Sequence, residues 1–415
     1  MTKRSRLSTV ALALALLVGL GLTACSDFDP NAPRSTPALP QTNPDAVTPG
    51  TSASSTTPTP SIVAPVSLSV VPDHGVEAAL PTDSLAVTVS GGELTDFSVA
   101  TAKGVDVPGK LTDGAWKPDR NFIPHTDFVA TGTVVNAVGA ATTKKVTFST
   151  LTPESNAWYD ILYDTFQVGV GMPATIQFAT AVETKEMRAE VERHVSVTTT
   201  PTTAGSWGWL DNRQLMWRPA KYWKPGTKVA VKANLAGIQT GTSKWIDHDA
   251  SGGFTIGASR ISYVNIATHE MTVTRDGKVV KRIPVTNGKT GFITRSGTKV
   301  IIERHSAIRM DSETIAIPAG SRDSYSLNVK WALRVTWTGE FVHAAPWSAA
   351  SHGVANVSHG CTGMSTANAK WFFDFSRAGD IVQYTGSNRR LLATDGIGVW
   401  TFTYDGWKAQ SALKG

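Results

Sequence analysis

Five positions recur at a fixed distance in the first half of this 415-residue chain. Trp116, Pro118, Phe122, Pro124 and Thr126 return 101 residues later as Trp217, Pro219, Trp223, Pro225 and Thr227. Self-similarity at a fixed offset is the mark of a duplicated structural unit. The recurrence therefore predicts two domains of one fold in tandem, over residues 66–150 and 151–255.

The residues between these markers form short apolar and polar alternations. Val87 and Val89 alternate with Thr88 and Ser90, and similar runs cover residues 129–134 and 146–148. A period of two indicates half-buried strands, and Gly, Pro and Asp between the runs indicate turns. About 85 residues of this pattern suit a sandwich of antiparallel strands.

Four tryptophans gather in the second of these domains, at positions 207, 209, 217 and 223. A row of tryptophans can form a surface on which sugar rings stack, but large aromatic side chains more commonly fill cores. We expect these four to pack in the core and at domain interfaces.

Residues 256–390 also predict strands. Residues 271–275 and 279–283 read as a hairpin, because Asp276-Gly277 supplies the positive φ angles of a type I′ turn. Further strands are expected within residues 329–342, and Ser365 or Thr366 is placed to cap a short helix that runs to Phe375. The whole chain is therefore expected to be mainly β.

The first 24 residues have the features of a secretory signal. Lys3, Arg4 and Arg6 precede an apolar stretch over residues 7–20, which is too short to span a bilayer comfortably. An ordinary signal peptide with an unrelated cysteine at position 25 is one interpretation of this end of the chain.

Residues 26–65 contain nine of the 22 prolines and a single aromatic residue, Phe28. Such a segment buries too little apolar surface to order itself and predicts a tether. Without the first 24 residues the chain has 36 Lys+Arg against 33 Asp+Glu. No basic run with interleaved aromatic residues accompanies this slight excess, so we expect no nucleic-acid partner.

Cys361, one of only two cysteines, lies in a histidine-containing stretch that also holds His343 and the run Ser358-His359-Gly360-Cys361. A thiol attacks only as thiolate, so a neighbouring imidazole favours a nucleophile. Gly360 permits a tight turn and exposed N–H groups for an oxyanion. Two alternatives remain: an inert, packed cysteine, or a zinc site, although no CxxC or HExxH spacing is present.

His343, a gap of fourteen residues and then Ser358-His359-Gly360-Cys361 resemble the signature of the YkuD-type L,D-transpeptidases, which cross-link peptidoglycan stem peptides. Met310-Asp311-Ser312, Tyr325, Phe341-Val342-His343 and Ala345-Pro346-Trp347 resemble the actinobacterial members in particular. The resemblance covers residues 256–408 well. It implies two immunoglobulin-like domains, a β-rich catalytic domain over 256–390 and a C-terminal extension, 391–415, that packs on the catalytic domain.

The resemblance also implies roles for individual residues. Cys361 would attack the carbonyl between the third residue of a tetrapeptide stem and its terminal D-alanine, and His343, oriented by the Ala344 carbonyl, would be the base. The Cys361 N–H and the Tyr325 hydroxyl would stabilise the oxyanion. The remaining residues would shape the loop or contact substrate: Met310, Trp347, Ser358, His359, Gly360, Thr362 and Gly363.

The implied partners are stem peptides as donor and acceptor, joined through third-position diaminopimelate, and β-lactams of the carbapenem type that acylate the thiol. No cofactor or metal is implied. Leu22-Thr23-Ala24-Cys25 resembles a bacterial lipobox, which implies cleavage before Cys25, its acylation and a place on the outer face of the cytoplasmic membrane. Cys361 would then stay free of a disulfide.

One position departs from the family pattern. The family usually has asparagine two residues after the cysteine, whereas this chain has Gly363. Glycine offers no side-chain hydrogen bond and adds backbone freedom, so slower catalysis or a changed substrate preference is expected. The alternatives are an L,D-carboxypeptidase, in which water wins over the acceptor amine, and a catalytically weak spacer lipoprotein that binds the cell wall.

Overall fold

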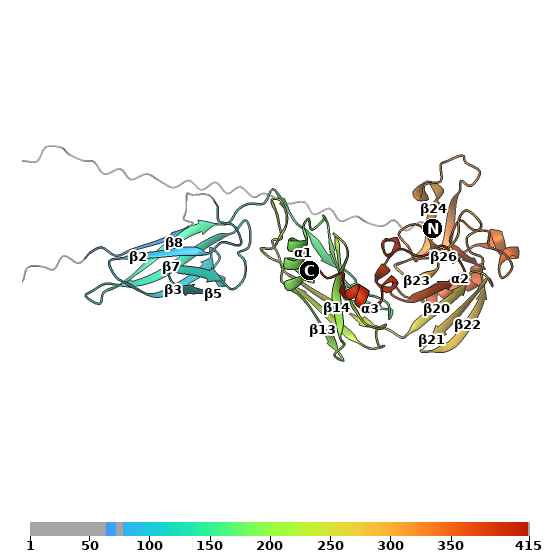
Figure 1. The fold of residues 1–415 in the computed structure, drawn as a ribbon, viewed down its shortest axis with the longest axis horizontal. Helices are drawn as coiled ribbons and strands as arrows, with labels where there is room; N and C mark the ends of the chain where they lie inside the picture. Colours follow the sequence, from blue (N-terminus) through green and yellow to red (C-terminus); the bar gives the residue numbers. More distant parts are fainter. Residues whose placement is uncertain (1–63, 72–77, 414–415) are drawn as a thin grey trace, which may run out of the picture. The chain divides into compact units, whose positions relative to one another are not determined.

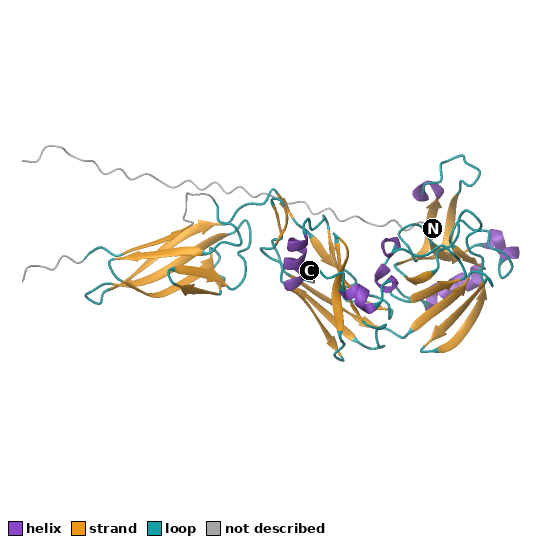
Figure 2. Ribbon diagram, viewed as in Figure 1, coloured by secondary structure: helices purple, strands orange, loops and turns teal. Residues whose placement is uncertain are grey.

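The structure, a computed structural model, describes residues 64–71 and 78–413, most of which form strands and loops (Figure 2). The predicted signal, the Cys25 lipidation site and nearly all of the tether lie outside these residues. Within the described ranges, no helix combines the length and apolarity needed to cross a membrane.

The first domain consists of two four-stranded sheets, whose facing side chains form one core around Trp116, Phe122, Phe128 and Phe148. One sheet has the order β1-β2-β6-β5, with bounds Ser67–Val71, Leu85–Ser90, Ala115–Pro118 and Gly109–Thr112. The other has the order β4-β3-β7-β8, with bounds Asp106–Val107, Glu93–Thr101, Asp127–Val135 and Ala141–Ser149. The predicted alternating runs fall in β2, β7 and β8.

The second domain repeats this plan with one added helix, α1 (Lys185–Arg193). One sheet is β10-β12-β15-β14, with bounds Tyr159–Ile161, Ala174–Phe178, Gln214–Pro219 and Gly205–Asp211. The other is β11-β19-β16-β13, with bounds Gln167–Val168, Ala250–Ile256, Lys228–Ala233 and Val195–Thr200. A small third sheet joins β17 (Gln239–Gly241), β18 (Lys244–Trp245) and β9 (Ser155–Asn156).

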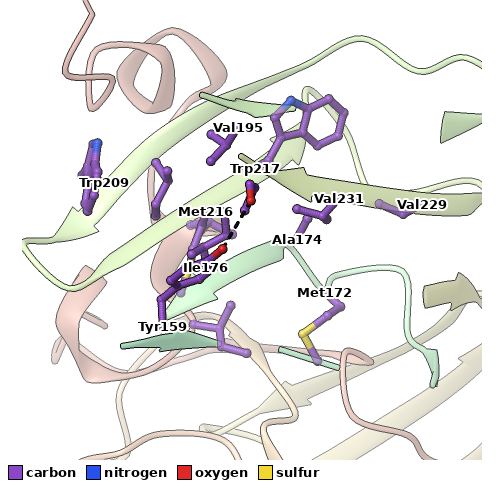
Figure 3. Close-up of a cluster of buried hydrophobic side chains, with 14 of the residues drawn as sticks. Tyr159, Met172, Ala174, Ile176, Val195, Trp209, Met216, Trp217, Val229 and Val231 are labelled. Atoms are coloured by element: carbon purple, nitrogen blue, oxygen red, sulfur yellow. Dashed lines mark hydrogen bonds between the residues drawn. The ribbon is translucent and has the colours of Figure 1, made fainter. Parts of the chain in front are cut away.

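The recurring tryptophans occupy equivalent hairpins, which explains the repeat. Trp116 lies in β6 and Trp217 in β15, and both are buried. In each hairpin the indole lies against a glycine of the neighbouring strand, Gly109 or Gly205, where any larger residue would collide with the ring. Figure 3 shows Trp217 and Trp209 among aliphatic side chains of the second core. Trp223 is buried there too, and Trp207 is partly buried against the same cluster, so core packing is confirmed for the four tryptophans.

The third domain is built from two sheets and the helix α2 (Thr366–Phe375), which buries Ala369 and Phe372 between them. The five-stranded sheet is β22-β21-β20-β28-β23, with bounds Lys278–Pro284, Glu270–Arg275, Arg260–Asn265, Ile381–Thr385 and Gly297–Val300 (Figure 1). The four-stranded sheet is β24-β25-β26-β27, with bounds Glu303–Asp311, Ser326–Arg334, Phe341–Ala344 and Thr362–Met364.

Two local predictions in this domain are confirmed. Asp276 and Gly277, between β21 and β22, have φ angles of 50° and 80°, as a type I′ turn requires. The side chain of Ser365 caps α2 by accepting a hydrogen bond from the Asn368 N–H at 3.3 Å.

The C-terminal extension packs on the catalytic domain, as its sequence suggested, and also on the second domain. It contains η3 (Ala393–Asp395), η4 (Gly398–Thr401) and α3 (Tyr404–Lys408). Trp407 is 0% exposed within the second core, and its Nε1 donates to the Ser206 carbonyl at 3.1 Å. The Arg218 guanidinium donates to the carbonyls of Phe402 and Thr403, each at 3.1 Å.

The first half of the extension, through η4, is bound to the third domain, where Ile397 and Val399 share a core with Val300, Ile302 and Ile381. The Asp395 carboxylate pairs with the Arg295 guanidinium at 3.1 Å, and its backbone carbonyl accepts from the Trp337 N–H at 2.7 Å. The extension therefore links the two domains, because its aromatic residues find apolar surface on the second one.

Candidate active site

A cavity of about 220 Å³ opens between the four-stranded sheet and the loop that precedes β27. Among its lining residues are eight predicted from the sequence: Met310, Tyr325, His343, Trp347, Ser358, His359, Cys361 and Gly363. They come from strands and loops that are far apart along the chain. The cavity is where the predicted nucleophile and base meet.

The pairing of β26 with β27 sets this arrangement. The two strands run parallel, with His343 opposite Gly363. Cys361 immediately precedes β27, so the thiol emerges at the end of one strand beside the imidazole on the other.

His343 is 6% exposed and has a fixed tautomer. Its Nδ1 lies 2.8 Å from the Ala344 carbonyl oxygen. Because a carbonyl only accepts, Nδ1 carries the hydrogen and Nε2 keeps its lone pair. Burial lowers the pKa of His343 to about 4, more than the Ala344 carbonyl raises it, so the ring is neutral at neutral pH.

Cys361 is 8% exposed, and its Sγ donates a weak hydrogen bond to the Gly339 carbonyl at 3.6 Å. Burial raises the pKa of the thiol to about 12. The pKa is lowered by a backbone hydrogen bond at Phe341 and by the cations Lys299 and Arg334. Glu340 raises it further. The resting pair is therefore a neutral thiol beside a neutral imidazole.

The loop before the thiol is held by two hydroxyls, those of Ser358 and Thr294. Ser358 Oγ donates to the Cys361 carbonyl at 2.6 Å and accepts from the Gly360 N–H at 3.1 Å. Gly360 has a φ of +121°, a value that residues with a side chain rarely adopt, and its carbonyl accepts from Thr294 Oγ1 at 2.8 Å. The Ser-His-Gly-Cys order thus fixes the direction of the thiol.

Tyr325 and His359 form one wall of the cavity. Their rings are 5.1 Å apart, and His359 Nε2 lies 3.4 Å from Asp323 Oδ1, which also accepts from Lys289 Nζ at 2.6 Å. Burial raises the pKa of Tyr325 to about 12, so its hydroxyl remains a hydrogen-bond donor at neutral pH.

Trp347 also lines the cavity. Its ring stacks on His343 with centroids 5.9 Å apart and is 57% exposed. Ser348 follows it, and its Oγ lies 3.4 Å from Nε2 of His352. The sequence singled out neither Ser348 nor His352 as part of the site.

Gly363 is held more firmly than its sequence suggested. Its N–H donates to the Thr286 carbonyl at 2.8 Å, and its own carbonyl accepts from the Thr286 N–H at 2.9 Å. A Cβ here would lie 2.8 Å from Ala345 Cβ and 3.0 Å from Thr286 Cγ2. Glycine therefore allows close approach of three segments, and the expected gain in backbone freedom is wrong.

Thr362 does not line the cavity, which corrects its predicted contact with substrate. Its side chain is buried, and its hydroxyl lies 2.9 Å from Asn287 Oδ1 and 3.0 Å from the Tyr384 hydroxyl. Alternation along β27 turns this side chain away from the cavity. Thr362 therefore supports the strand from behind.

A buried group of charges lies behind the thiol and was also missed. Glu340 binds both Arg295, at 3.0 Å, and Lys299, at 2.5 Å. Arg295 contacts Asp395 on its other side. These residues come from segments with no shared motif, so only the fold reveals the cluster.

The described residues contain no group of three or more His, Cys, Asp or Glu arranged to hold a metal ion. His343 Nδ1 is bound to a carbonyl, and His359 Nε2 faces a carboxylate.

The chain thus has two immunoglobulin-like sandwiches, followed by a β-rich domain in which a cysteine and a histidine share one cavity. This combination is that of a multidomain enzyme. A model of the L,D-transpeptidase catalytic domain matches residues 259–383, and a model of a bacterial Ig domain matches residues 76–239. L,D-transpeptidase 2 of Mycobacterium tuberculosis is 35% identical over 325 residues, which cover 77% of this chain and 79% of that protein. The chain therefore belongs to the L,D-transpeptidase family and is an L,D-transpeptidase.

Other relatives match a shorter part of the chain. L,D-transpeptidase 1 of the same organism is 38% identical over 219 residues, which cover 53% of this chain and 80% of that protein. The solved structure of an LD transpeptidase in complex with imipenem is 34% identical, covers 56% of this chain and 100% of its own, and has a TM-score of 0.48. L,D-transpeptidase 3 of Mycobacterium tuberculosis, solved with a faropenem-derived adduct, is 29% identical, covers 55% and 97%, and has a TM-score of 0.47.

Proposed function

We propose that Cys361 forms an acyl-enzyme with a tetrapeptide stem and transfers the acyl group to an amine of a second stem. The observation that carries this proposal is the shared cavity of Cys361 and His343, in which the Ala344 carbonyl leaves Nε2 of His343 free to accept a proton. Since both groups rest in their neutral forms, the thiol proton passes to Nε2 as Sγ attacks.

The first half-reaction breaks the bond to the terminal D-alanine. Sγ bonds to the carbonyl carbon of the third residue, and the carbonyl electron pair moves to oxygen. The Cys361 N–H and the Tyr325 hydroxyl are the proposed donors to this oxyanion. When the intermediate collapses, the C–N bond breaks and the D-alanine amine takes the proton from His343, leaving a thioester on Cys361.

The second half-reaction makes the cross-link. The side-chain amine of a third-position diaminopimelate on another stem attacks the thioester, gives a proton to His343 and releases the thiol, which takes that proton back. Water in place of the amine would give an L,D-carboxypeptidase. The apolar and aromatic lining, with Met310, Leu327 and Trp347 at the cavity, favours a peptide acceptor that excludes water from the thioester.

Carbapenems are the inhibitors we propose for this site. Relatives have been solved in complex with imipenem and with a faropenem-derived adduct. Attack of Sγ on the strained β-lactam carbonyl would form an acyl-enzyme in the same way as attack on a stem peptide, since ring opening replaces loss of D-alanine.

We also propose that the protein is a lipoprotein anchored through Cys25 on the outer face of the cytoplasmic membrane. The support is the basic start, the short apolar stretch and the Leu22-Thr23-Ala24-Cys25 ending. Residues 26–65 would serve as a tether of at most ~120 Å at ~3.1 Å per residue. Radiolabelled palmitate incorporation into the full chain but not into Cys25→Ala tests this anchor.

Covalent trapping tests the nucleophile. The full chain is incubated with imipenem, and the mass of the intact protein and of the Cys361 peptide is measured. The proposal predicts one adduct on Cys361, its absence in Cys361→Ala and a much slower adduct in His343→Ala. A folded wild-type chain without an adduct would instead favour the wall-binding spacer.

A further inference from the structure

A lysine is fully buried directly behind the catalytic loop. Lys299, on β23, has a side chain with 0% exposure, and its Nζ lies 2.5 Å from the Glu340 carboxylate and 3.6 Å from the centre of the Tyr384 ring. A buried ammonium is tolerated only when it is paired, and here a carboxylate and an aromatic face hold it.

The two partners of the lysine lie near the residues on either side of the nucleophile. On one side, the Tyr384 hydroxyl lies 3.0 Å from Thr362 Oγ1. On the other side, Glu340 Cγ and Oε1 lie 3.7 Å and 3.9 Å from the point that a Cβ atom on Gly360 would occupy. The carbonyl that accepts from the Cys361 thiol belongs to Gly339, the residue before Glu340.

Stability alone does not explain this pair. Replacing a buried ion pair by apolar residues of similar volume is often neutral or even stabilising. The position of this ion pair behind the loop that carries the nucleophile therefore points to a role in the chemistry.

We propose that Lys299 acts on Cys361 through its charge: held by Glu340 and Tyr384 behind the catalytic loop, it supplies positive charge on the buried side of the thiol. The inference rests on the proposed role of Cys361 as nucleophile. The charge matters because attack develops negative charge on a sulfur from which water is excluded.

The charges around the thiol come from several elements. Glu340 raises the pKa of Cys361, whereas Lys299 on β23 and Arg334 on β25 lower it. Tyr325 and His343 line the cavity, Tyr384 on β28 lies behind Thr362, and Arg295 joins Glu340 to Asp395 of the C-terminal extension. Arg295, Lys299, Glu340 and Asp395 together are neutral.

Removing the lysine and removing the glutamate have different electrostatic consequences. Lys299→Met leaves the cluster with one net negative charge, which disfavours the thiolate. Glu340→Gln leaves the cluster neutral if Lys299 loses its proton, and with one net positive charge if Lys299 keeps it. In neither case is the thiolate of Cys361 disfavoured. A purely structural role would make both variants less reactive.

Alkylation of Cys361 by iodoacetamide separates these cases, because the thiolate displaces iodide without any need for stem peptide. The rate is measured against pH on the full chain by mass spectrometry of the Cys361 peptide, so Cys25 does not contribute. Lys370→Met removes an exposed lysine of α2 and is the matched control. Thermal unfolding confirms that each variant is folded.

We expect Lys299→Met to raise the thiol pKa by about 1 unit, which slows alkylation at about pH 8 by about tenfold. Glu340→Gln and Lys370→Met should keep or exceed the wild-type rate. An unchanged rate in folded Lys299→Met, or an equal loss in both cluster variants, overturns the proposal. If Lys299→Met does not fold, Glu340→Gln decides: a retained or higher rate supports the charge argument, and a lower one contradicts it.

Cross-linking assays on the same variants keep the two proposals apart. Suppose that neither the wild type nor any variant forms cross-links, but the alkylation rates differ as stated. The proposed function then fails, and the role of Lys299 stands. If the wild type forms cross-links and Lys299→Met alkylates normally, the role of Lys299 fails alone.

Discussion

Trp407→Ala should detach the C-terminal extension from the second domain. The indole is completely buried, donates to the Ser206 carbonyl at 3.1 Å and packs so closely on β14 that a Cβ at Gly208 would lie 2.9 Å from the ring. Arg218 keeps two aromatic partners without it, since its guanidinium lies 4.6 Å from the Trp400 ring centre and 5.6 Å from the Tyr404 ring centre.

The size of the effect follows from this burial. Truncating a buried tryptophan to alanine costs about 3–5 kcal/mol, because the surrounding strands collapse only partly into the cavity. For a domain of about 150–250 residues, each kcal/mol lowers Tm by about 2–4 °C, so a decrease of about 6–20 °C is expected. Because the extension joins two domains, we also expect one cooperative transition to separate into two.

Differential scanning calorimetry of the full chain measures both effects, with Trp347→Ala as the control. Trp347 is largely exposed, and its loss should change stability by about 0.5 kcal/mol or less. A Trp407→Ala transition within about 2 °C of the wild type, and still single, would refute the linking role of the extension.

Three further predictions concern the catalytic residues. Gly360→Ala forces a side chain into φ +121° and should cost about 1–3 kcal/mol together with a loss of imipenem acylation; unchanged unfolding would contradict the strain. Ser358→Ala releases the Gly360 N–H and the Cys361 carbonyl, and should slow acylation by about tenfold with a smaller effect on Tm. The pKa of His343 is about 4 in the folded state, below its unfolded value of about 6.5. Its stabilising contribution is therefore complete above about pH 6.5 and is lost as pH falls through about 4. Denaturant titrations should show a pH dependence of up to about 3 kcal/mol in the free energy of unfolding, and this dependence should disappear in His343→Gln.

Local patterns predicted much of the fold because strands and turns depend on neighbouring residues. The recurrence of Trp116 as Trp217 marked two hairpins in which an indole lies on a glycine. Asp276-Gly277 specified its turn through φ angles that few other residue pairs adopt. The spacing of His343 and Cys361 located a cavity that includes both side chains.

Features that depend on long-range packing were not accessible in this way. Lys299 and Glu340 have no local pattern, because only the pairing of distant strands brings them together behind the loop. The family resemblance assigned Thr362 a contact with substrate, but strand alternation turns its side chain inward. The family resemblance placed the extension on the catalytic domain and gave no sign that Trp407 would be buried against the second domain.

The central claim is that Cys361 transfers an acyl group between stem peptides. The most direct test incubates the full chain with disaccharide-tetrapeptide and compares the products of wild type and Cys361→Ala by mass spectrometry. The account predicts dimers that lack one D-alanine, formed by the wild type and absent with Cys361→Ala. Tripeptide monomers alone would make the enzyme a carboxypeptidase, and unchanged substrate from the folded wild-type chain would contradict the account.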